Sequence, residues 1–173
     1  MTATSRKVIR LLPVQAALVL LLAAGPVFAQ HPKYGVKVAF NKKAHFANLR
    51  SYAWQSGWKS YDPRVDAHIT LAVDRELAAL GLVKSPAGPS DVTISYATLQ
   101  RTDVNLKAKR GPDGSRPTYP VGSLVVIMRD ESSQQELFRG RVDTPIKIDY
   151  DVLEKTINDQ VSQIFARYPT RRH

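Results

Sequence analysis

Side chains that could do catalytic chemistry are sparse in this sequence, and they do not fall into a known catalytic spacing. Cysteine is absent, which excludes a thiolate zinc site, a cysteine nucleophile and a lipid anchored on cysteine. The histidines, at positions 31, 45, 68 and 173, show no spacing typical of a metal site. A Gly-x-Ser-x-Gly elbow and a phosphate-binding glycine loop are also missing. We therefore expect no metal and no cofactor, although a site assembled from distant segments stays open.

Carboxylates could act as general acids and bases, but most of them have a structural use here. Asp149 and Asp151 precede a predicted helix, where acidic groups stabilise the first turn. Asp130 and Glu131 lie in a predicted hairpin turn. Glu76 differs, because its helical angle places it inside the apolar face of another predicted helix. A buried carboxylate needs a cationic partner or a proton, so we expect Glu76 at the rim of that face, with its head group in water.

Two loops carry side chains that could bind a ligand or a partner. Trp58 and Tyr61 lie in a loop with glycine and serine, where they could offer a stacking surface for sugar rings or a partner protein, or could cover the core. Trp54 ends a predicted strand and is expected in the core. The loop at about 107–120 contains several glycines and prolines and is expected to be mobile. Its cations could contact anionic lipid headgroups or polysaccharide, or could simply be solvated; they are Lys107, Lys109, Arg110 and Arg116.

Length and composition fit one ordinary globular domain. The chain has 173 residues, 43% of them hydrophobic, which is too apolar for a wholly disordered protein. It has 25 Lys and Arg against 15 Asp and Glu, giving a formal net charge of +10. This basic balance suits an anionic counterpart, and it also serves solubility.

The N-terminus has the layout of a secretory signal. Three cations within residues 6–10 precede an almost wholly apolar run at 11–24, and small residues follow up to Ala29. The run is shorter than the ~20 residues that cross a bilayer, so we expect cleavage after Ala29 and not a retained anchor. Loss of three cations lowers the formal net charge from +10 to +7. We expect a periplasmic protein, without a transmembrane segment in the mature chain and with no nucleic acid as partner.

Hydrophobic periodicity outlines the elements of the mature chain. Alternating or continuous apolar runs predict strands at about 36–40, 51–54, 92–97 with a continuation toward 106, 124–128 and 136–142. Helical spacing predicts helices at about 63–80 and 151–168. Asp62 and Pro63 form a helix start and Gly81 a helix stop, while Asp151 and Glu154 have capping-box spacing. Gly140 marks a bulge or a close backbone approach within its strand.

The order of these elements predicts an α+β fold. Strands and helices do not alternate along the whole chain, which argues against a doubly wound parallel sheet. We expect a two-layer sandwich, in which a mostly antiparallel sheet carries both amphipathic helices on one face. The predicted organisation is a signal peptide at 1–29 and a single domain at 30–173, with its core at about 36–169.

Several segments together resemble the domain of unknown function 4136 family, found mainly in bacterial envelope lipoproteins. They are FANLRSYAW at 46–54, Asp62-Pro63 leading to Gly81-Leu82, DVTISY at 91–96, GSLVV at 122–126, Asp130 with LFRG at 137–140, and a last helix ending in Tyr168-Pro169. The resemblance implies a two-layer sandwich facing the periplasm and brings no catalytic residues. Two features depart from the family: no cysteine stands at the cleavage site, and Phe138 stands where the family often has Trp.

We therefore expect an exported, non-enzymatic module that binds an envelope protein or an anionic envelope component. The contact residues we expect are Trp58, Tyr61, Lys107, Lys109, Arg110 and Arg116. One alternative is a periplasmic hydrolase, which would gather titratable side chains in a concave pocket. Another is a small-ligand carrier, which would have an apolar cavity between the helices and the sheet.

Overall fold

The computed structural model describes residues 34–86, 88–146 and 152–170. The chain divides into two compact units, Met1–His31 and Pro32–His173, and all described residues belong to the second. The predicted signal peptide at 1–29 and its cleavage point after Ala29 lie outside the described residues.

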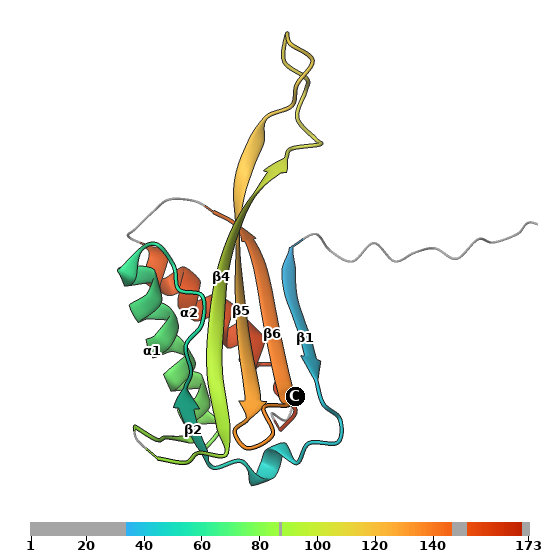
Figure 1. Cartoon of the computed structure of the whole chain (residues 1–173). Helices are drawn as coiled ribbons and strands as arrows, with labels where there is room; N and C mark the ends of the chain where they lie inside the picture. The colour runs from blue at the N-terminus through green and yellow to red at the C-terminus, as the bar shows by residue number, and fades with distance from the viewer. Residues whose placement is uncertain (1–33, 87, 147–151, 171–173) are drawn as a thin grey trace, which may run out of the picture. The chain divides into compact units, whose positions relative to one another are not determined.

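Within the described residues, six strands form one mixed sheet (Figure 1). Across the sheet they are β1 (Gly35–Phe40), β6 (Glu136–Pro145), β5 (Thr118–Asp130), β4 (Val92–Val104), β2 (Ser51–Trp54) and β3 (Val83–Lys84). The neighbouring pairs β1–β6, β6–β5 and β5–β4 are antiparallel, whereas β2 is parallel to both β4 and β3. The predicted α+β class with a mostly antiparallel sheet is confirmed.

Helix α1 (Pro63–Ala79) begins and ends as its sequence predicts. The side chain of Asp62 accepts a hydrogen bond from the Arg64 amide, and Pro63 occupies the first helical position. At the other end Gly81 has φ +84°, a left-handed conformation that costs glycine little. The amide of Leu82 then donates to the Leu77 carbonyl, which closes a Schellman motif.

Helix α2 (Leu153–Phe165) is shorter than the predicted 151–168. Its N-cap residue is Val152, which makes no side-chain capping bond, and Asp151 of the expected capping box lies outside the described residues. The helix ends before Tyr168, whose side chain is nevertheless buried in the core. Both helices lie behind the sheet in the view of Figure 1.

The face of the sheet toward the helices is built from even-numbered positions of the central strands. Ile94, Met128 and Phe138 form one cross-strand row, and all three are fully buried. The next row is Tyr96, Val126 and Gly140. Because successive side chains of a strand point to opposite faces, the odd positions make up the other face.

Gly140 lets helix α2 lie directly on strand β6. A Cβ atom at this position would stand 2.0 Å from Cγ2 of Ile164. The predicted close backbone approach is therefore confirmed. Around it, Phe138 stacks on Phe165 with ring centroids 5.9 Å apart, and Tyr168 tilts against Phe138 at 5.3 Å.

Several expectations need correction. Strand β5 begins at Thr118, so the loop expected at 107–120 is shorter and the strand expected at 124–128 is longer. Glu76 is only 7% exposed, so the expectation that its head group lies in water at the rim is wrong. Trp54 is half-buried against the core and donates from Nε1 to Asp74 on helix α1 at 2.8 Å. The short helix η1 (Phe46–Asn48) and strand β3 were not expected from the sequence pattern.

Candidate functional site

The most distinctive feature outside the core is a long hairpin that extends beyond the sheet. Strands β4 and β5 pair from Val92 with Asp130 to Val104 with Thr118, but β6 accompanies β5 only as far as Val121. Beyond that point the two strands have no further neighbouring strand among the described residues, and they rise above the body of the sheet (Figure 1). We call residues 102–120 the arm and residues 105–117 its tip.

The tip has a defined conformation held by local hydrogen bonds. The amide of Asn105 donates to the Pro117 carbonyl at 2.8 Å, which continues the ladder of the arm. Farther out, the Gly111 amide donates to the Ser115 carbonyl at 2.8 Å, and Gly114 has φ +78°. Arg110 also donates to the Gly114 carbonyl at 2.7 Å. The tip is therefore a closed turn in which glycine supplies the left-handed conformation.

The tip concentrates positive charge. It carries Lys107, Lys109, Arg110 and Arg116 against a single carboxylate, Asp113. The first three cations are exposed and Arg116 is half-buried. Asp113 accepts one bifurcated hydrogen bond from the Ser115 hydroxyl and one hydrogen bond from the Ser115 amide, and both hold the pKa of this carboxyl below its usual range. Leu106, next to Lys107 in the sequence, has 69% of its surface exposed. The tip therefore presents an apolar side chain as well as its cations to the solvent.

Charged and polar side chains on the odd-numbered face brace the base of the arm. Arg101 on β4 donates to Asp103 and to Asp143 of β6, both at 3.2 Å. Arg141 donates to the same Asp143 at 2.9 Å. Tyr34 donates to Asp103 at 3.0 Å and also hydrogen-bonds the Tyr119 hydroxyl on β5. These contacts connect the arm to strands at the centre and at the edge of the sheet.

Asp143 is the anchor of this network. Its side chain is almost fully buried and accepts hydrogen bonds from two arginines and from Ser123. Burial alone would raise the pKa of Asp143, but the hydrogen bonds from Arg141, Ser123 and Arg101 outweigh it and hold the pKa below its usual range. The carboxyl is therefore ionised at neutral pH and serves a structural role.

The aromatic loop lies apart from the tip. Trp58 pairs with Ala97 of β4 through its backbone, and its side chain is 72% exposed. Tyr61 is fully exposed, so the interpretation that these two residues cover the core is wrong. The distance along β4 from Ala97 to Val104, the last residue before the tip, is about 23 Å at the usual rise of a strand. The structure thus does not bring the expected aromatic and basic residues together.

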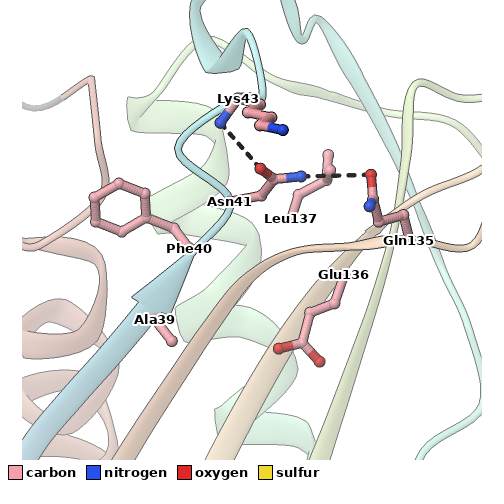
Figure 2. A pocket seen from close by; sticks show the side chains of 7 residues that line it. All are labelled: Ala39, Phe40, Asn41, Lys43, Gln135, Glu136 and Leu137. Carbon is pink, nitrogen blue, oxygen red and sulfur yellow. Dashed lines mark hydrogen bonds between the residues drawn. The ribbon is translucent and has the colours of Figure 1, made fainter.

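Hollows in the described part of the chain include a groove at the sheet edge and a cavity under the helices. One is an open groove of about 440 Å³ between the end of β1 and the start of β6 (Figure 2). In this groove the Asn41 side chain accepts a hydrogen bond from the Lys43 amide and donates one to the Gln135 side chain. The nearby Glu136 carboxylate accepts hydrogen bonds from the Arg139 guanidinium. The other is a cavity of about 270 Å³ between both helices and the sheet, near the base of the arm.

Within the described part of the chain, no three His, Cys, Asp or Glu side chains come close enough to hold a metal ion. His45 and His68 belong to this part, whereas His31 and His173 lie outside it. In the same part, no helix combines the length and the apolar character that a bilayer crossing requires.

The fold and the site together define a small α+β module that carries a basic hairpin arm. The chain belongs to the DUF4136 family, a domain of unknown function whose family model matches residues 36–170. The predicted resemblance is confirmed. No protein of curated function matches the chain.

Solved structures share the fold at low sequence identity. A PDZ domain protein from Parabacteroides distasonis is 14% identical with a TM-score of 0.58, over 81% of this chain but only 36% of that one. The PelC dodecamer from Paraburkholderia phytofirmans is 13% identical with a TM-score of 0.54, over 80% of this chain and 99% of that one. A DUF4136 family protein from Bacteroides thetaiotaomicron is 12% identical with a TM-score of 0.50, over 75% and 95% of the two chains.

Proposed function

We propose that this chain is an exported binding module of the cell envelope, whose arm contacts an anionic component. The observation that carries the proposal is the composition and position of the tip. It contains four cations and one carboxylate, and it lies beyond the point where β6 stops pairing with β5. Charges on a projecting element meet a partner before the rest of the surface does, and cationic side chains near an anionic surface gain about 1 kcal/mol each. The bracing of the arm by Asp143 and Asp103 supports the same role, because a held arm loses less entropy on contact.

Export is the second part of the proposal. It is supported by the charged start, the apolar run and the small residues before Gln30. Mass spectrometry of the protein from whole cells tests it directly. We expect a chain that begins at Gln30 in the periplasmic fraction, whereas an intact N-terminus on cytosolic protein would contradict export.

Envelope retention tests the role of the tip. Alanine at Lys107, Lys109, Arg110 and Arg116 should lower the fraction of protein retained on envelope preparations at low salt by about tenfold or more. Retention of the wild-type protein should fall as salt is added, because exposed charges are screened.

A matched control removes the same number of charges elsewhere. Lys37, Lys42, Lys43 and Arg75 are exposed and lie outside the arm. Alanine at these four positions lowers the net charge equally, so it should leave most of the retention intact. If both variants lose the same fraction of their envelope retention, net charge alone explains the retention, and the proposed role of the arm would be wrong.

The hydrolase alternative gains no support from the described residues. The groove of Figure 2 contains one carboxylate, Glu136, which already pairs with Arg139. The cavity between helices and sheet has a single charged residue in its lining, Lys59. The carrier alternative, in contrast, has a specific observation in its favour, which is the cavity itself.

A further inference from the structure

The cavity beside the base of the arm arises from a taper in the core. Far from the arm, the rows that face the helices carry large side chains such as Phe138, Met128 and Ile94. Near the arm the last row is Thr144, Gly122 and Gln100, with glycine at its centre. These short or polar side chains do not fill the space below the first turns of the two helices.

Gly122 keeps this space open. A Cβ atom at this position would stand 3.3 Å from Cγ1 of Ile146, and a larger side chain would extend into the cavity. An engineered cavity of about 150 Å³ lined by apolar side chains can hold a benzene ring. The 270 Å³ found here therefore suits an apolar group of nearly twice that size.

The lining combines apolar side chains, some of them buried, with neutral polar ones. Its buried apolar part is Ile69, Leu124 and Ile157, one from each helix and one from β5. Less buried apolar side chains extend it outward; they are Tyr61, Val65, Leu99, Pro145, Ile146 and Leu153. The lining also contains hydroxyl and amide groups, supplied by Ser60, Thr98, Gln100, Thr144, Thr156 and Gln160. Lys59 is exposed and is the one charged residue among the lining residues that the structure describes. A mostly apolar site with neutral hydrogen-bonding groups and one cation is complementary to an anionic amphiphile.

From this arrangement we infer that the cavity binds the acyl end of a single-chain anionic amphiphile, with its head group near the Lys59 ammonium. The buried apolar side chains receive the chain, and hydroxyl and amide groups of the lining hydrogen-bond the polar end. This site differs from the tip, and it does not depend on the proposed contact of the arm with the envelope.

Calorimetric titration of the purified mature protein with decanoate, below its micelle concentration, tests the inference. We expect saturable binding of one molecule per chain. Thr98→Leu fills the cavity from β4 and should weaken binding at least tenfold. Thr102→Leu makes the same change on an exposed position of the arm and should bind decanoate as the wild-type protein does. Thr156→Leu fills the cavity from α2, so it gives an independent result even where one variant folds poorly by circular dichroism.

The head group is tested by changing its charge. Lys59→Gln should weaken decanoate binding about threefold to tenfold but leave the affinity for decanol unchanged. Decyltrimethylammonium should bind more weakly than decanoate. Absence of saturable decanoate binding, or wild-type affinity for decanoate in both cavity-filling variants, would overturn the inference. Each of these outcomes is read without envelope material, so it is distinct from failure of the tip proposal.

Discussion

Replacement of Gly140 by alanine should lower the free energy of unfolding by about 3 kcal/mol, because the new methyl group overpacks the core. Its Cβ would stand 2.0 Å from Cγ2 of Ile164, far inside contact distance. Ile164 is fully buried, and a β-branched side chain in a helix has essentially one rotamer. The side chain therefore cannot turn away, and helix α2 must shift from strand β6. Urea unfolding of both proteins measures the difference.

A double-mutant cycle identifies the cause. Ile164→Ala should itself lower the free energy of unfolding by about 2–4 kcal/mol, because it leaves a cavity. It also removes the atom that the new Cβ would meet. The double variant should therefore be more stable than the sum of the single effects predicts, by about 1 kcal/mol or more. Additive effects would mean that Gly140 is required for some reason other than its contact with Ile164.

Asp143→Asn should lower the free energy of unfolding at pH 7 by about 2–3 kcal/mol, somewhat less than for a fully buried ion pair because both arginines are partly exposed. The amide cannot balance Arg101 and Arg141, which would then repel each other across the base of the arm. Chemical denaturation at pH 7 measures this loss. The matched control is Asp159→Asn, whose exposed pair with Lys155 should contribute less than about 1 kcal/mol.

The contribution of Asp143 also depends on pH. Its pKa is lower in the folded protein than in the unfolded chain, where it lies near the ordinary value of about 3.9. Stabilisation is therefore complete above that value and is lost as the pH falls through the folded pKa. The gap between the wild-type protein and Asp143→Asn should narrow below about pH 4. A gap that is constant down to pH 2.5 would show that the charge of Asp143 is not what stabilises the fold.

The sequence predicts the elements well wherever local signals are strong. Helix α1 has a capping aspartate at one end and a glycine with positive φ at the other, and both ends lie where these residues indicate. The aromatic run at 51–54 predicts strand β2 with the bounds that the structure has. Strand ends were harder to predict, because Pro117 and Pro120 suggest a loop, although β5 starts between them.

The hydrogen-bond network at the base of the arm depends on how strands β4, β5 and β6 are aligned with one another. A single sequence does not reveal this alignment. Arg101, Asp143 and Ser123 are far apart along the chain and meet only because β4, β5 and β6 are paired as they are. The cavity has the same origin, since Thr144, Gly122 and Gln100 form a row only in this register. The helical pattern alone also does not predict that Glu76 is buried, because its burial depends on what packs against helix α1.

The most direct test of the arm as a contact element is site-specific crosslinking in living cells. A photoreactive amino acid at Leu106, at the tip, is compared with the same amino acid at Leu71 on helix α1. The two leucines are matched in exposure, at 69% and 67%. We expect crosslinks to envelope material from position 106 and few from position 71. Equal yields at both positions, or crosslinks from position 71 alone, would contradict the role of the arm.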